Sequence, residues 1–280
     1  MGITALWQEL ETTLTPVLLD FRRRLDRLDI SEKPDHTLLT EADLTVQDRI
    51  VAAVLAHDPG ATIVAEEAGV QHGEMASTER IWVIDPIDGT AEFVRPDRTE
   101  FCSVVCLLED RRPTAALIIA PEIGVSRTTV TIRVDGFGSP IIVNGKPGTL
   151  ITSAASQASV TRSATTGARP WERRMTAAGF TLKTRTTSQT LDMVRTCVDL
   201  TEDTGGDLTP FALFYRESQK VWDGAAGMCL AYTAGLDVCD GQGRNMPVVD
   251  LDLTSAEPTF ESTLVAAPDV VHQFIAWSAG

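Results

Sequence analysis

The stretch I-W-V-I-D-P-I-D-G-T at residues 81–90 runs from four largely apolar residues into two aspartates and a Gly-Thr pair. The apolar run predicts a buried strand. Pro86 has no N–H to give to a sheet, so we expect the strand to end at Asp85. Taken alone, Asp88-Gly89 is typical of a turn. Two carboxylates this close repel each other unless a cation lies between them, so the stretch also indicates a cation site.

Hydrophobic spacing around this stretch predicts helices before it and short strands on either side of it. Apolar residues recur every three or four positions over 5–29, which predicts an amphipathic helix, although Pro16 argues against an unbroken one. A second helix is expected over 41–57, because T-E-A-D can begin it and H-D-P-G can end it. Strands are expected at 62–65, 81–84, 103–108, 115–120, 130–134 and 141–143.

The second half of the chain has a different texture, in which helices alternate with single strands. Helices are expected at 170–178, 189–198, 223–234 and 268–277, and strands at 180–184 and 211–215. The change follows N-G-K-P-G, so we expect a domain boundary near residue 149, between an α+β half at 1–148 and an α/β half at 149–280. The predicted fold class is α/β or α+β, in two layered halves.

Composition restricts the partners that the chain can have. Its 280 residues carry a net charge of −15, which disfavours a nucleic acid polymer or an anionic membrane as the main partner. A small anionic substrate stays compatible with this charge if metal cations supply a local positive field. The five cysteines form no C-x-x-C pair, and the start of the chain shows no signal-peptide pattern. We therefore expect reduced thiols and a cytoplasmic protein.

Other acidic residues occupy positions similar to those of the two aspartates. Glu66 follows the strand T-I-V-A, Asp43 and Thr40 match a helix capping box, and Asp223 in W-D-G-A-A-G begins a predicted helix. Each has an ordinary structural explanation when taken singly. Their conjunction indicates a shared site of oxygen ligands, which suits Mg²⁺ better than zinc because no set of His and Cys accompanies it.

The same motifs resemble the inositol monophosphatase family. The resemblance rests on A-E-E-A-G at 65–69, W-V-I-D-P-I-D-G-T at 82–90, N-G-K-P at 144–147 and W-D-G-A-A-G at 222–227, and it extends from about residue 33 to 240. It implies a sugar-phosphatase-like layered sandwich with alternating α-β-α-β-α layers. It also implies a Mg²⁺-dependent, Li⁺-sensitive phosphatase that forms a homodimer. The first half would hold most metal ligands, and the second would supply Asp223 and the substrate wall.

Carried over position by position, the resemblance implies a metal centre of two or three Mg²⁺ ions. Glu66, Asp85 and the backbone carbonyl of Ile87 would hold one ion. Asp85 would bridge to a second ion, which Asp88 and Asp223 would also hold. Glu66 would touch a third, weaker ion as well.

Catalytic and phosphate-binding roles follow from the same resemblance. Asp43 would support the water shell of the third ion and pair with the Thr90 hydroxyl to orient the attacking water, with Glu66 as a further catalytic residue. Asp88 and the backbone N–H groups of Gly89 and Thr90 would face the substrate phosphate. Hydrolysis would be direct, with no covalent intermediate on the protein.

The substrate is indicated less sharply than the reaction. The segment K-P-D-H-T-L-L-T-E-A-D at 33–43, with Lys33 and Asp35, resembles the 3'(2'),5'-bisphosphate nucleotidase branch of the family. Arg216 could bind a second phosphate, or it could be a solvated surface residue. The segment T-T-S-Q-T-L-D at 186–192 departs from that branch, because a lysine expected near its end is absent, while Ser188 stays a candidate substrate contact.

The predicted function is therefore hydrolysis of a small phosphorylated metabolite. A nucleotide 3'(2')-phosphate such as 3'-phosphoadenosine 5'-phosphate, or a related nucleoside or sugar phosphate, is the first choice. Inositol 1-phosphate is the alternative substrate. A non-catalytic protein that binds a phosphorylated ligand on the same fold is the alternative of another class.

Overall fold

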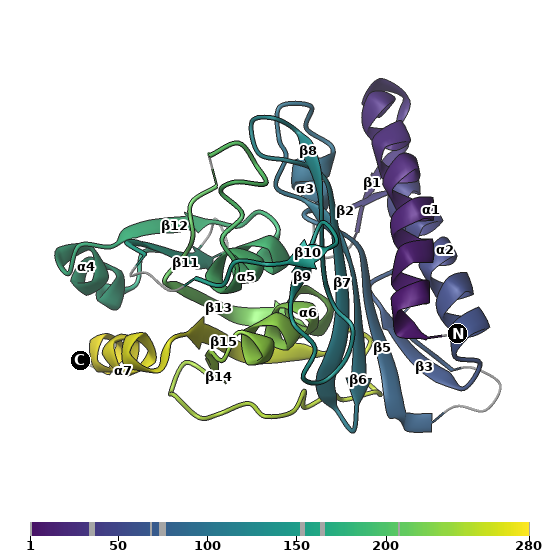
Figure 1. The fold of residues 1–280 in the computed structure, drawn as a ribbon. Coiled ribbons are helices and arrows are strands. Elements are labelled where there is room, and N and C mark those ends of the chain that lie inside the picture. Colours follow the sequence, from purple (N-terminus) through teal and green to yellow (C-terminus); the bar gives the residue numbers. More distant parts are fainter. Residues whose placement is uncertain are drawn as a thin grey trace.

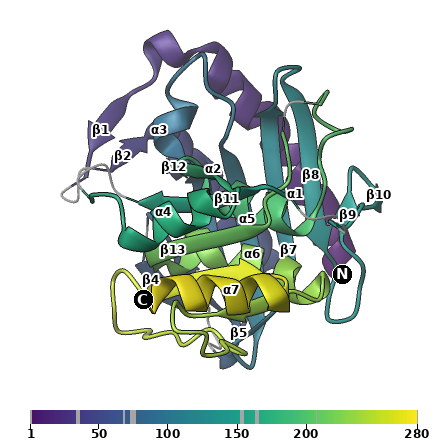
Figure 2. The same ribbon diagram turned by 90° about the vertical axis from the view of Figure 1, so that its left-hand side faces the viewer.

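Helices and sheets alternate in five layers across the molecule, as Figures 1 and 2 show. The computed structural model describes residues 2–33, 37–67, 69–72, 77–151, 155–162, 166–206 and 208–279. The layers are the helix pair α1 (Ile3–Arg23) and α2 (Glu41–His57), an eight-stranded sheet, the pair α5 (Gln189–Cys197) and α6 (Val221–Thr233), a five-stranded sheet, and the pair α4 (Pro170–Ala177) and α7 (Pro268–Ser278). The predicted α-β-α-β-α sandwich is confirmed.

The larger sheet is built from the first half of the chain, in the order β10-β9-β8-β7-β6-β5-β3-β4. Its strands are β3 (Ala61–Ala65), β4 (Gly69–His72), β5 (Ser77–Asp88), β6 (Cys102–Glu109), β7 (Arg112–Ile123), β8 (Thr128–Val134), β9 (Ile142–Val143) and β10 (Lys146–Pro147). All neighbours are antiparallel except β3 and β5, which run parallel. A small hairpin of β1 (Ile30–Glu32) and β2 (Leu38–Thr40) stands apart from this sheet.

The smaller sheet is built from the second half, in the order β12-β11-β13-β15-β14. Its strands are β11 (Gln157–Arg162), β12 (Thr181–Arg185), β13 (Leu213–Lys220), β14 (Asp237–Cys239) and β15 (Thr259–Ala266). β11 runs parallel to both β12 and β13, whereas β15 is antiparallel to β13 and β14. The two sheets thus use different halves of the chain, although one hydrophobic cluster joins both sheets to α5 and α6.

Alternation along β5 explains why its sheet is covered on both faces. Trp82 and Ile84 pack toward α1 and α2, whereas Ile81 and Val83 pack toward α5 and α6. All four are almost fully buried, as a strand between two helical layers must be.

The two helices of the middle layer pack closely because α6 carries small residues. A Cβ atom on Gly227 would lie 2.5 Å from the sulfur of Met193 on α5, so only glycine fits there. This close approach brings the first turn of α5 next to the first turn of α6, and both turns contribute to the site described below.

The structure corrects one prediction about β5, because the strand continues past Asp85 to Asp88. Its pairing with β6 shifts between Asp85, opposite Val104, and Asp88, opposite Cys102, so three steps on one strand match two on the other. This is a β-bulge, and Pro86 is tolerated within it. Residues three apart on a regular strand point to opposite faces, whereas the extra residue lets both aspartates point the same way.

Other element bounds differ in smaller ways from the predicted ones. The first helix includes Pro16 without a break but ends at Arg23, and a short 3₁₀ turn at Leu25–Arg27 follows it. The expected strand at 211–215 extends to Lys220, so α6 follows it directly and Asp223 lies in the first turn of α6, where the N-cap is Lys220. Seven of the described strands were not predicted: β1, β2, β4, β10, β11, β14 and β15. None of the helices in the described parts of the chain has the length and apolar character needed to cross a membrane.

Candidate active site

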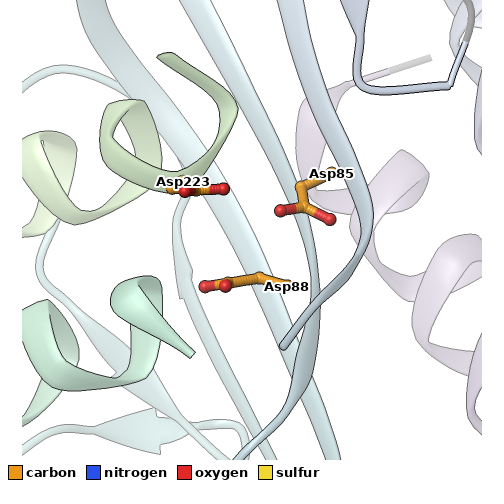
Figure 3. A group of neighbouring side chains, drawn as sticks. All are labelled: Asp85, Asp88 and Asp223. Carbon is orange, nitrogen blue, oxygen red and sulfur yellow. The ribbon is translucent and has the colours of Figure 1, made fainter. Parts of the chain in front are cut away.

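Three aspartates from distant parts of the chain meet between the two halves of the molecule (Figure 3). Asp85 and Asp88 come from the bulged end of β5, and Asp223 comes from the first turn of α6. Each offers one carboxylate oxygen, and these oxygens lie within 4.8 Å of one another. The structure therefore brings together the three aspartates that the sequence motifs singled out.

The chemistry of this triad fits a divalent metal ion. Burial raises the pKa of Asp85 well above its usual range, and the charges of Glu66, Asp88 and Asp223 raise it further. Asp223 is shifted in the same direction for similar reasons. The Oδ1 atom of Asp85 is buried and has no hydrogen-bond partner among the residues that the structure describes. Clustered, desolvated carboxylates that repel one another are the environment that a hard cation such as Mg²⁺ stabilises.

Asp88 is held by the N-terminal turn of α5. Its Oδ2 atom accepts hydrogen bonds from the Ser188 hydroxyl at 2.7 Å and from the backbone N–H of Thr190 at 2.7 Å. Its Oδ1 atom accepts from the backbone N–H of Gln189 at 3.3 Å. Burial raises the pKa of Asp88 to about 6, and these donors limit the rise. Ser188, predicted to contact substrate, thus lies against Asp88 and fixes its orientation.

Glu66 lies at the end of β3, beside the aspartates. Lys33 places its ammonium 2.8 Å from Glu66 Oε1 and 2.6 Å from Glu67 Oε1. Burial works against the charge of Lys33, but the two carboxylates outweigh it and raise its pKa. The charge of Glu66 also helps to raise the pKa of Asp85, which places the two acids in one electrostatic unit. Asp35, from the same predicted motif, lies outside the described residues.

Thr90 and Asp43 approach each other next to this unit. Asp43 Oδ2 closes the predicted capping box by accepting from the backbone N–H and the hydroxyl of Thr40, at 2.8 and 2.6 Å. Its Oδ1 atom lies 3.4 Å from the hydroxyl of Thr90, which is also 3.0 Å from the carbonyl oxygen of Ile87. Burial raises the pKa of Asp43 to about 6. The Thr90 hydroxyl therefore lies between two acceptors, Asp43 Oδ1 and the carbonyl oxygen of Ile87.

Gly89 starts the short helix α3 (Thr90–Phe93) and could not be replaced without distortion. Its φ of +92° lies in the left-handed region, and a Cβ atom there would be 3.0 Å from the carbonyl oxygen of Glu100. The backbone is thus packed tightly between the aspartates and the neighbouring loop. The N–H groups at the start of a helix have no partner within the helix, so they can donate to an anion.

These groups surround a cavity of about 360 Å³, which lies between the two halves of the chain. The side from the first half is formed by the acids and by the turn at Gly89 and Thr90. The opposite side comes from the second half and consists of Thr186, Thr187, Gln189, Lys220, Trp222, Asp223 and Glu257. A small phosphorylated molecule is of a size that such a cavity can hold.

Arg216 does not line the cavity itself but contacts Thr186, which does. Its Nη1 atom donates to the hydroxyl of Thr186 at 3.1 Å, and its Nε atom is buried with no hydrogen-bond partner in the part of the chain that the structure describes. Burial lowers its pKa, which the charge of Asp223 partly offsets. Arg216 is therefore a partly buried cation beside the site, and the interpretation as a solvated surface arginine was wrong.

Two functional features of this region were missed in the sequence. Gln189 bonds to Asp223, as discussed below. Lys183 from β12 places its ammonium 2.6 Å from Asp192 Oδ1 and within 3.3 Å of the Glu100 carboxylate. The lysine expected near residue 191 is absent from α5, and Asp192 of that helix pairs with Lys183 of β12. A buried aspartate within a predicted helix was the signal that could have indicated such a partner.

Comparison with known proteins places this geometry in a family. A profile of the inositol monophosphatase family matches residues 4–276. The chain is 28% identical to the Nus factor SuhB of Xylella fastidiosa over 84% of this chain and 80% of that protein. Over shorter stretches it is 38% identical to a histidinol-phosphatase of Mycobacterium tuberculosis, covering 36% of this chain and 38% of that one. It is 34% identical to the 3'(2'),5'-bisphosphate nucleotidase CysQ of Aggregatibacter actinomycetemcomitans, covering 38% of each.

Solved structures support the same assignment of the fold. The crystal structure of the extragenic suppressor protein SuhB from Bartonella henselae matches with a TM-score of 0.77 and 16% identity, over 99% of this chain and 98% of that one. These matches show that the chain has the layered fold of the inositol monophosphatases. The chain belongs to the inositol monophosphatase family, whose members act on small phosphorylated substrates, and the predicted phosphatase class is confirmed.

Proposed function

We propose that this protein is a Mg²⁺-dependent phosphomonoesterase that removes the 3'(2')-phosphate of a nucleotide such as 3'-phosphoadenosine 5'-phosphate. The main support for this reaction is the buried triad of Asp85, Asp88 and Asp223, in which Asp85 Oδ1 has no hydrogen-bond partner within the described parts of the chain. Such a site is electrostatically unfavourable until it holds cations, and it opens into a cavity of about 360 Å³.

The ligands of the metal would be Glu66, the three aspartates and the carbonyl oxygen of Ile87. When bound there, Mg²⁺ would neutralise charge on the phosphate and lower the pKa of a water molecule. The Thr90 hydroxyl would accept or donate a proton between that water and Asp43, which lies 3.4 Å away. The N–H groups of Gly89 and Thr90 would bind the phosphate oxygens.

Arg216, behind the far wall of the cavity, supports a substrate with a second anionic group. It stands behind Thr186, and its Nε donor has no hydrogen-bond partner among the described residues, whereas Lys220 on the wall itself is paired with Glu257. Glu92 also lines the cavity, but Arg185 neutralises it with an ion pair at 2.5 Å. Because its charge is neutralised by Arg185, Glu92 is poorly placed to bind a positively charged group of the substrate. This favours a bisphosphate over a phosphate ester that carries an amine.

A panel of phosphate esters, assayed for phosphate release with Mg²⁺ and with a chelator, tests the proposal. The panel contains 3'-phosphoadenosine 5'-phosphate, 2'-AMP, 3'-AMP, inositol 1-phosphate, fructose 1,6-bisphosphate and histidinol phosphate. We expect Mg²⁺-dependent release that is fastest with 3'-phosphoadenosine 5'-phosphate. A preference for inositol 1-phosphate would support the alternative substrate. Release from none of them by protein that binds Mg²⁺ would support a non-catalytic binding protein.

Replacing Arg216 with glutamine tests the second anionic group directly. 3'-phosphoadenosine 5'-phosphate and 3'-AMP differ only in the 5'-phosphate, so the ratio of their kcat/KM values isolates its recognition. Loss of a charge-assisted hydrogen bond is expected to lower this ratio about tenfold. Arg80→Gln is the control, because Arg80 pairs with Asp58 and Glu109 at the other end of β5. An unchanged ratio in Arg216→Gln would remove Arg216 from the proposal.

Three further properties complete the proposal. Li⁺ should inhibit phosphate release, because it could replace the more weakly held Mg²⁺. The protein should sediment as a homodimer, and it should reside in the cytoplasm. Analytical ultracentrifugation tests the second of these properties, and an assay with rising LiCl against a KCl control tests the first.

A further inference from the structure

The first turn of α5 contacts two of the three aspartates, Asp88 and Asp223. The contact with the Asp223 carboxylate is made by the side chain of Gln189, which belongs to none of the motifs that carry the family resemblance. Gln189 donates from Nε2 to Asp223 Oδ2 at 2.5 Å. Its backbone N–H donates to Asp88 Oδ1 at 3.3 Å. A single residue thus connects an aspartate of β5 with an aspartate of α6, more than a hundred residues apart in sequence.

The arrangement of the Gln189 side chain indicates a role beyond packing. The residue is 7% exposed, and its Oε1 atom has no hydrogen-bond partner among the described residues. A buried amide oxygen without a partner costs about 1–3 kcal/mol relative to a satisfied one. The amide cannot turn round to relieve this cost, since Oε1 would then face the carboxylate of Asp223. A residue that destabilises the fold in this way is more often retained for a site than for stability.

We propose that Gln189 is a positioning residue for the metal centre, which orients Asp223 for the cation. By holding Oδ2 of Asp223, the amide turns the other carboxylate oxygen toward Asp85 and Asp88. Thr190 secures the same turn, because its hydroxyl donates to the backbone carbonyl of Asp223 at 3.0 Å. Groups that hydrogen-bond a metal ligand fix its direction, and their loss typically lowers metal affinity by about 10–100-fold.

The inference rests on the proposed function only in requiring that the site binds a divalent cation. It does not depend on which phosphate ester is the substrate. Metal affinity, measured by isothermal titration calorimetry with Mg²⁺ and Mn²⁺ in the absence of substrate, is therefore the readout. Gln189→Met keeps the length of the side chain and removes its donor, so we expect it to weaken metal binding about 10–100-fold.

The chain offers a matched control in Gln219. Gln219 is also buried. Among the described residues its Oε1 atom also lacks a partner, but its Nε2 atom lies 3.6 Å from the sulfur of Met193 and not against a carboxylate. Gln219→Met therefore makes the same change close to the site without touching a carboxylate. We expect its metal affinity to stay within about twofold of wild type, because substitutions without a role at the site have small effects.

The outcomes separate this inference from the proposed function. Wild-type affinity in Gln189→Met, or equal losses in Gln189→Met and Gln219→Met, would overturn the role of Gln189 and leave the phosphatase proposal intact. Absence of Mg²⁺ and Mn²⁺ binding in the wild-type protein would overturn both. If Gln189→Met fails to fold by circular dichroism, Gln189→Leu and Gln189→Ala provide the same comparison with smaller side chains.

Discussion

Asp223→Asn is expected to lower kcat/KM for phosphate release about a thousandfold while leaving the protein folded. The substitution removes one negative charge from the triad that would hold the cation, and a loss of about 4 kcal/mol in transition-state stabilisation corresponds to this factor. The fold should tolerate the change because the Gln189 amide can then turn round. In that orientation the Oε1 atom of Gln189, which lacks a partner among the described residues of the wild-type protein, would accept a hydrogen bond from the side-chain amide of the asparagine.

The assay for this prediction is phosphate release with 3'-phosphoadenosine 5'-phosphate at saturating Mg²⁺, beside a thermal melt of the same sample. Asp58→Asn is the control, because it makes the same chemical change far from the triad, where Asp58 accepts from Arg80 and Trp82. Its activity should match wild type. Activity of Asp223→Asn within threefold of wild type would show that Asp223 does not hold the catalytic cation.

The architecture was predictable from the sequence because its core elements have strong periodic patterns. The leucines of α1 recur on one face, and the apolar run of β5 fits a strand between two helical layers. β11 was missed for a physical reason. β11 reads Q-A-S-V-T-R, whose short polar side chains are typical of loops, and it is a strand only because β12 and β13 supply its hydrogen bonds.

The candidate site was predictable in its residue types but not in its geometry. The motif around Asp85 and Asp88 named two carboxylates, yet a strand ending at Asp85 gave no reason for them to face the same way. That reason is the bulge across Pro86, which depends on pairing with β6. Gln189 had no signal in a single sequence, because its partner Asp223 is near it only after α5 and α6 have packed together.

Metal-free Asp85→Asn is expected to be more stable than the metal-free wild-type protein, by about 1–3 kcal/mol at pH 8. Burial and the charges of Glu66, Asp88 and Asp223 raise the pKa of Asp85 in the folded protein, so its charged form opposes folding. An acid with a raised folded-state pKa destabilises the fold fully above that pKa. This penalty fades as the pH falls toward the unfolded-state pKa of about 3.9. The stability advantage of the variant should therefore be largest at pH 8 and disappear near pH 4.

Saturating Mg²⁺ should offset most of this advantage, because a cation held by the triad stabilises only the folded state. Metal at a hundred times its Kd adds about 2.7 kcal/mol to wild type, and a site that lacks the Asp85 charge gains less. Thermal melts at pH 8, 6 and 4.5, each with chelator and with Mg²⁺, measure both effects.

Asp58→Asn is again the control variant. Although burial works against it, hydrogen bonds from Arg80 and Trp82 lower the pKa of Asp58, so its loss should destabilise the protein at pH 8. A metal-free Asp85→Asn protein that melts below wild type at pH 8 would contradict the electrostatic account of the triad, which rests on the burial of Asp85 and its repulsion by the neighbouring acids.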